Sequence, residues 1–193
     1  MAFVGLRYAV FAPEKSHTEG QPIVYDPGIV MAKMVSADIT MTRNSEGLYA
    51  DDALAESDNS ITGGTISLTL DDVLPEAQVA VFGVKKSGEG ESAIYRETGK
   101  STPYGGFGYI RERRHQGKTQ FVGYWLHRVQ LAITNETANT RTGTTTYQTP
   151  TVSGNIMGVK LDSDGENYFR DFKVADTVEA VKTWIDGLAN LKA

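Results

Sequence analysis

The strongest local pattern in the sequence is FGYIRERRHQGKTQFVGYWLHRVQLAI, residues 107–133. Two runs, 107–114 and 119–133, flank a short polar segment in which Gly117 can supply the positive φ that a hairpin loop needs. One face of the second run carries Phe121, Trp125, Val129, Leu131 and Ile133. The middle of the opposite face carries Val122, Tyr124 and Leu126. A strand that is apolar on both faces lies centrally in a sheet or at an interface, so this stretch predicts a central β-hairpin.

Further strands follow from apolar residues that alternate with polar ones. Residues 35–41 place Val35, Ala37, Ile39 and Met41 on one face, which predicts a half-buried strand. Residues 65–70 alternate in the same way after a Gly63-Gly64 pair that permits a bulge or bend. Strands are also expected over residues 6–11 and 150–161, with a Thr-rich loop or extended arm over 134–149.

Two helices interrupt the β pattern. The first, near 72–82, has acidic residues and Pro75 at its start and Gly83 just past its end. The second, near 177–189, has Asp176 as its expected N-cap and Glu179 as the capping-box partner. Its apolar stripe should pack against a sheet or a neighbouring subunit: Val178, Val181, Ile185 and Leu188, flanked by Trp184. The expected fold class is therefore mainly β with a minor helical part.

Composition narrows the possible functions. The 193 residues include 40% hydrophobic and 22% charged residues, which fits one folded domain spanning 1–193. Zero cysteines exclude disulfides, thiol nucleophiles and zinc fingers. A net charge of −5 argues against a general nucleic-acid coat. No signal peptide or long apolar run is visible, so we expect a soluble protein that is made in a cytoplasm and has no membrane partner.

Charge is unevenly distributed along the chain. Residues 44–84 contain eight acidic residues and no basic residue, whereas residues 96–128 contain seven basic and two acidic residues. Such runs are often solvated faces. The alternative is that patches of opposite sign dock against each other in an assembly of identical subunits.

No combination of residues predicts catalysis or metal binding. His17, His115 and His127 lack the spacing of a ligand pair. The segment 162–167 resembles the start of a calcium loop, but its glycine is at the fourth position and Lys173 stands at the twelfth, so we expect a turn. The glycine-rich segment 105–108 fits neither a P-loop nor a dinucleotide fingerprint and more simply permits close backbone approach. We therefore expect no enzyme activity, no metal and no cofactor.

The order of these motifs is similar to that in a known protein family, and the resemblance covers nearly the whole chain. A YADD segment (49–52) leads through an acidic loop to the strand GGTISLTL (63–70), and a helix follows. Then come the segments YGGFGYIR (104–111) and FVGYWLHRV (121–129), a Thr-rich stretch ending in YQTP (147–150), and VSGNIMG (152–158). A Trp184-bearing end completes the series, which resembles the major tail protein, or tail tube protein, of phages with long, non-contractile tails.

The resemblance implies a β-sandwich or barrel that forms hexameric rings, which stack into a tail tube and conduct the genome during ejection. It further implies a virion location after assembly in the host cytoplasm. The implied partners are other copies of the chain, the tape-measure protein, the tail terminator, distal tail or baseplate proteins, and double-stranded DNA in transient, non-specific passage. We expect no C-terminal immunoglobulin-like domain, which some relatives carry.

The long loop after the second strand reaches an adjacent ring in this family, and here it corresponds to the acidic loop at about 44–62. The residues expected at the docking site are Tyr49, Asp51, Asp52, Glu56, Asp58, Arg111, Arg113, Arg114 and Lys118. Two alternatives remain open at this point. One is an inner-tube subunit of a contractile injection machine, and the other is a carbohydrate-binding β-sandwich using Tyr104, Phe107, Tyr109, Tyr124 and Trp125.

Overall fold

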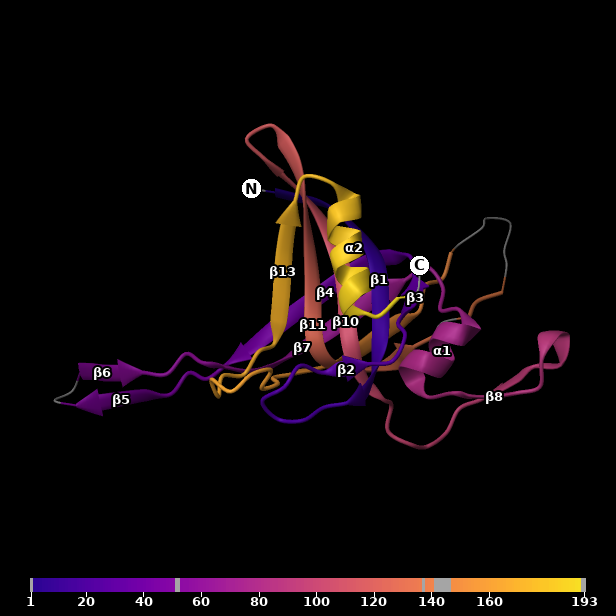
Figure 1. Cartoon of the computed structure of the whole chain (residues 1–193), viewed down its shortest axis with the longest axis horizontal. Coiled ribbons are helices and arrows are strands. Elements are labelled where there is room, and N and C mark those ends of the chain that lie inside the picture. The colour runs from indigo at the N-terminus through magenta and orange to yellow at the C-terminus, as the bar shows by residue number, and fades with distance from the viewer. Residues whose placement is uncertain (1, 51–52, 137, 141–146, 192–193) are drawn as a thin grey trace.

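The computed structural model describes residues 2–50, 53–136, 138–140 and 147–191. The chain is mostly antiparallel β-structure, with α2 lying against the strands and α1 beside one end of them (Figure 1). Its elements are β1 (Ala2–Ser16), β2 (Val24–Tyr25), β3 (Ile29–Ala32), β4 (Met34–Arg43), β5 (Gly47–Ala50), β6 (Ala53–Ser57), β7 (Ile61–Leu70), α1 (Pro75–Phe82), β8 (Lys85–Ser87), a 3₁₀ turn (Gly90–Ser92), β9 (Ile94–Arg96), β10 (Tyr104–His115), β11 (Lys118–Asn135), β12 (Thr151–Met157), β13 (Arg170–Ala175) and α2 (Val178–Leu188).

The predicted central hairpin is confirmed as β10 and β11. Gln116 and Gly117 have φ values of 49° and 77° and form a two-residue loop between the paired residues His115 and Lys118. The main sheet runs β2-β1-β10-β11-β12-β7-β4. Strand β13 pairs with the first half of β11, and β12 pairs with the second half. The long strand β11 therefore belongs to both halves of the fold.

The prediction that one face of β11 runs unbroken from Phe121 to Ile133 is wrong. Gly105 pairs with Val129 but Phe107 pairs with Leu126, so β11 gains one residue in a bulge at positions 127–128. Because side chains alternate along a strand, one extra residue exchanges the two faces. Trp125 consequently packs towards α2, whereas Val129 joins Leu126 in the other core.

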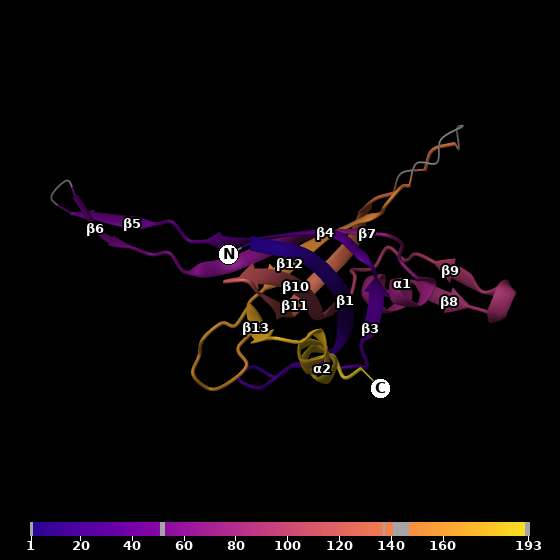
Figure 2. The same ribbon diagram turned by 90° about the horizontal axis from the view of Figure 1, so that it is seen from above.

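Two apolar cores result from this exchange. The larger lies between the two halves of the sheet and includes Phe11, Leu68, Phe107 and Leu131, with α1 closing one end. The smaller lies between the sheet and α2, where Trp125, Val181 and Ile185 are fully buried. In the view from above, α2 covers one side of the molecule, and β4, β7 and β12 form the other (Figure 2).

Both helices form, with corrected starts. Helix α1 begins at Pro75 rather than near 72, because in the turn before it the Asp71 carboxylate accepts the Asp72 N–H and the Asp72 carboxylate accepts the Val73 N–H. It ends at Phe82, and Gly83 follows it as the predicted C-terminal glycine, with a φ of 69°. The N-cap of α2 is Thr177, whose hydroxyl accepts the Ala180 N–H, and not Asp176.

Strand β4 also departs from simple alternation. Its pairing with β7 shifts between Met34 and Ser36, and the shift leaves Val35 60% exposed instead of on the core face. Ala37, Ile39 and Met41 do pack against the larger core, as the alternation predicts. In β7, the alternating apolar residues are buried throughout.

A largely buried ion pair joins β1 to the bulge of β11. Arg128 Nη2 donates to Glu14 Oε1 at 3.0 Å, and Nε lies 2.8 Å from Oε2. The Glu14 side chain is only 11% exposed, so it depends on Arg128 for its charge partner. Arg128→Met should therefore lower the free energy of unfolding by about 2 kcal/mol, measured by urea denaturation. The double variant Glu14→Gln/Arg128→Met should recover much of that loss, and a double variant less stable than Arg128→Met would contradict this account.

Candidate functional site

Residues 44–50 and 53–62 form an acidic arm that projects from the body of the protein (Figures 1 and 2). Strands β5 and β6 pair only with each other among the described strands. At the base of the arm, Asn44 N–H donates to the Ser60 carbonyl at 2.8 Å, which continues the β4–β7 hairpin outward. A two-stranded hairpin without further packing is marginally stable in water, so the described strands of the arm add little to the stability of the body.

The arm carries the predicted acidic residues. Tyr49 lies in β5, Glu56 lies exposed in β6, and Asp58 lies exposed near the base. Asp51 and Asp52 fall outside the described residues. Residues 44–62 include five acidic residues and no basic residue, so a partner surface of positive charge suits them.

Asp58 organises the base of the arm. Its carboxylate accepts the Ser60 N–H at 2.9 Å and the Asn44 side-chain amide at 2.7 Å. Because these bonds favour the charged form, the backbone bond from Ser60 most of all, they lower the Asp58 pKa below its usual 3.8. The arm base therefore keeps its negative charge to mildly acidic pH.

This pKa shift predicts a pH effect at the arm base. The folded-state pKa is depressed, so the stabilisation is present above the ordinary pKa of 3.8 and is lost as the pH falls through the lower folded value. NMR titration of the Asp58 carboxyl carbon should show a midpoint below 3.8. Ser60→Pro removes the backbone donor and should raise that midpoint. A wild-type midpoint at or above the ordinary value would contradict this assignment.

The predicted basic residues gather at the β10–β11 end. The Arg111 guanidinium lies 3.7 Å from the centre of the Phe3 ring, and Arg113 Nη2 donates to Gln120 Oε1 at 2.8 Å. Arg114 and Lys118 are exposed near the turn. This end and the acidic arm project in different directions (Figure 1), so the chain does not bring its two predicted partners together. Docking between them would require two copies.

Beside this end lies a cleft that the sequence does not predict. It has a volume of about 540 Å³ and opens between β1, β4, β10 and β13. We call it the cationic cleft and define it by Phe3, Val35, Tyr109, Arg111 and Arg170. Asp38 on the β4 side also lines it. A row of aromatic rings leads from the buried Tyr109 across the half-buried Tyr124 to Phe172 of β13, which is 66% exposed.

The outward face of β4, β7, β12 and the end of β11 is lined by hydroxyl and amide groups. We call it the hydroxyl face, and its members are Asp38, Thr40, Thr65, Ser67, Gln130, Thr134, Ser153 and Asn155. These residues border a hollow of about 740 Å³ that Lys100 also lines. No aromatic side chain occurs among the described residues that line it.

The aromatic residues of the carbohydrate-binding alternative belong mainly to the cores. Phe107 and Trp125 are fully buried, and Tyr109 is 2% exposed. Tyr124 is half-buried between Tyr109 and Phe172. A sugar-binding platform needs aromatic faces open to solvent, so these contacts disfavour that alternative.

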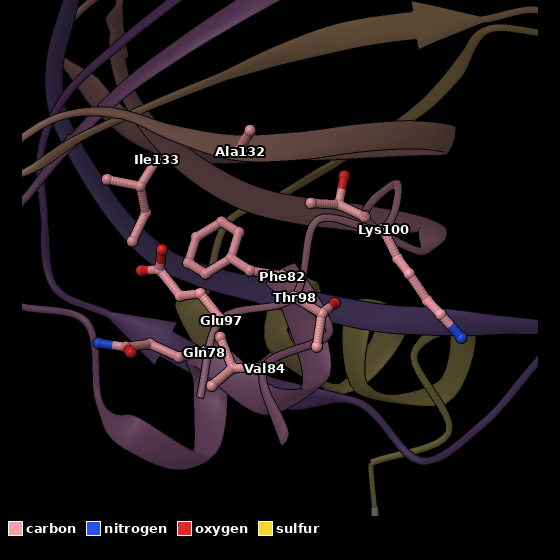
Figure 3. Close-up of a pocket in the computed structure, with 9 residues that line it drawn as sticks. Gln78, Phe82, Val84, Glu97, Thr98, Lys100, Ala132 and Ile133 are labelled. Carbon is pink, nitrogen blue, oxygen red and sulfur yellow. The ribbon is translucent and has the colours of Figure 1, made fainter. Parts of the chain in front are cut away.

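The pocket beside α1 is small. It measures about 140 Å³ and lies between Phe82 of α1, Ile133 of β11 and the segment 97–102. The Glu97 carboxylate and the Lys100 ammonium point to opposite sides of Phe82 (Figure 3). This volume is below that of typical small-molecule sites, and the two charged groups do not converge on a common point.

The residues described by the structure include no group of three or more His, Cys, Asp or Glu side chains that could hold a metal ion. The predicted turn at 162–167 is confirmed: the Asp162 and Asp164 carboxylates accept the backbone N–H groups of Asp164 and Glu166. Tyr168 donates its hydroxyl proton to Asp164. Within the described ranges, no helix has the length and apolar character needed to cross a membrane.

No protein-family model and no curated protein matches the amino-acid sequence of this chain. A functional assignment therefore depends on the motif order and on the surfaces described above.

Proposed function

We propose that the chain is a structural subunit that polymerises as stacked hexameric rings into the tail tube of a phage with a long, non-contractile tail. One observation carries this proposal most strongly. The sheet half made of β11, β12, β7 and β4 buries one face in the core, presents the hydroxyl face on the other, and ends in an open edge strand.

The edges of this sheet half are suited to pairing between neighbouring copies of the chain, which would close the sheets into a barrel. Strand β4 pairs only with β7 among the described strands. On the other side, pairing of β11 with β10 ends at Gln130, so no described strand pairs with residues 131–135 along that edge. Unpaired edges bind other chains, and closing a sheet into a barrel removes them. We infer that β4 of one copy lies next to the end of β11 of the following copy around a ring.

The hydroxyl face suits the wall of a conduit. Its side chains are short, polar and mostly uncharged, and Asp38 adds negative charge. Phosphates bind where basic residues neutralise them, so a wall with few basic groups lets DNA pass without being held. We propose that this face lines the lumen, with α2 on the outer surface, and that the tape-measure protein occupies the lumen before ejection. The tail terminator and distal tail proteins would bind the two ends of the tube, giving a virion location.

Cysteine labelling tests this orientation, because the natural chain has zero cysteines. Ser67→Cys places a thiol on the hydroxyl face, and Glu179→Cys places one on the exposed side of α2. In assembled particles, a bulky polyethylene-glycol maleimide should modify Glu179→Cys readily and Ser67→Cys at least about tenfold more slowly. In the unassembled chain, both should react at similar rates. Equal reactivity of both variants in assembled particles would overturn the lumen assignment.

A further inference from the structure

We propose that the cationic cleft is the receptor for the acidic arm of a second copy of the chain. The inference deepens the proposed assembly and rests on it, because it names the contact that joins one ring to the next. Its starting point is two surfaces of one molecule: an arm whose described strands pair only with each other, and a cleft bordered by exposed apolar side chains and two arginines.

The cleft offers both apolar area and positive charge. Phe3 is 43% exposed, Val35 is 60% exposed, and Phe172 at the end of the aromatic row is 66% exposed. Apolar side chains gathered in this way on a soluble chain mark an interaction surface. Arg111 and Arg170 border the same cleft, and the Arg170 guanidinium lies 5.4 Å from the centre of the Tyr124 ring. The aromatic contacts hold both arginines at the border of the cleft.

The arm has matching chemistry. Its sequence GLYADDALAES, residues 47–57, mixes apolar residues with carboxylates, and Glu46 precedes it as a further exposed acid. Arginine binds carboxylates better than lysine does because its planar fork can donate two parallel bonds. A partner that supplies both carboxylates and apolar side chains therefore fits the cleft better than a purely acidic or a purely apolar one.

The contact must join different copies. The arm leaves the body at residues 44 and 60 and extends away from it (Figures 1 and 2). The cleft lies on the body, between β1, β4, β10 and β13. An arm that docks into a different surface on the next copy makes a head-to-tail contact, and repetition of such a contact builds an open filament. This is the geometry needed to stack rings into a tube of many layers.

Charge-reversal substitutions test whether the acidic arm binds the cationic cleft. The cleft variant Arg111→Glu/Arg170→Glu and the arm variant Glu46→Arg/Glu56→Arg should each raise the protein concentration needed for assembly at least about tenfold, because like charges then oppose each other. The chain that carries all four substitutions should return to within about threefold of the wild-type value, because opposite charges face each other again. Sedimentation velocity measures these concentrations, and circular dichroism and Tm show that each variant is folded.

The control is Lys173→Glu combined with Lys85→Glu. Lys173 lies on β13 between Phe172 and Val174, so its side chain points to the opposite face of the strand, and Lys85 is exposed on β8. This control has the same change in charge as the cleft variant, and it should assemble like the wild type. Assembly of the cleft and arm variants at the wild-type concentration would overturn the docking while leaving the tube proposal intact. Failure of the four-substitution chain to recover would also overturn the pairing, and a wild-type chain that never assembles would overturn both proposals.

Discussion

Removal of the acidic arm should give a folded monomer that no longer assembles. Replacement of residues 45–59 by a two-residue Asn-Gly turn joins Asn44 to Ser60, which already share a backbone hydrogen bond of 2.8 Å. The arm strands pair only with each other among the described strands, so the Tm of the monomer should change by no more than a few degrees. Assembly, followed by sedimentation velocity, should fall below detection at concentrations at which the wild type polymerises.

A milder variant distinguishes the contribution of the arm's charge to assembly from that of its length. Replacing Asp51, Asp52, Glu56 and Asp58 by Asn or Gln keeps the length of the arm and removes four charges. This variant should assemble at higher protein concentration than the wild type and with a weaker dependence on salt, because salt screens charge pairs that lie near the surface. Normal assembly of the arm-deleted chain, or an unchanged salt response of the amide variant, would show that the arm does not contribute to polymerisation.

Gly106→Ala should cause a large loss of stability from a single methyl group. A Cβ atom at Gly106 would lie 2.2 Å from Cζ2 of Trp125, and that ring is fully buried between the sheet and α2. The backbone or the ring must therefore shift, and overpacking of this kind costs about 3 kcal/mol. Urea denaturation measures the loss. Gly99→Ala is the matched control, because nothing lies within 4 Å of the added Cβ, and it should change stability by less than about 0.5 kcal/mol.

A double-mutant cycle tests whether the loss of stability in Gly106→Ala comes from the clash with Trp125. Trp125→Leu is itself destabilising but opens space above Gly106, so adding Gly106→Ala to it should cost about 1 kcal/mol or less. The difference between the two backgrounds is the coupling energy of the methyl–indole clash. If Gly106→Ala cost the same in both backgrounds, the glycine would be required for a reason other than space for Trp125.

The sequence predicts those parts of the fold that depend on local pattern. Alternation locates β7 and the β10–β11 hairpin, and Gly117 has the positive φ expected of it. The helix signals at Pro75 and Gly83 locate α1 to within a few residues. These features are set by neighbours along the chain, so a single sequence is sufficient to find them.

The sequence-based predictions that are wrong all concern features that tertiary structure determines. The bulge in β11 near His127 and the shift beside Val35 depend on which strand pairs with which, and alternation carries no information about that choice. The N-cap of α2 is Thr177 instead of the predicted Asp176 for a related reason. The Asp176 carboxylate accepts a hydrogen bond from the Gln120 side chain at 3.2 Å, and this contact comes from a distant part of the chain.

The sequence predicts only some of the proposed docking surfaces. The acidic arm and the basic end of the hairpin are visible as charge runs in the sequence. The cationic cleft is not, because Phe3, Arg111 and Arg170 come from three strands that are far apart in the chain and meet only through the sheet order. No periodicity or spacing in the sequence relates these three residues to one another.

Negative-stain electron microscopy of the concentrated wild-type protein is the most direct test of the tube proposal. We expect rings or tubes of uniform diameter with a stain-filled lumen, formed by the chain alone or after addition of tail partners. Monomers at every protein and salt concentration tested, with no tubes in the presence of those partners, would contradict it.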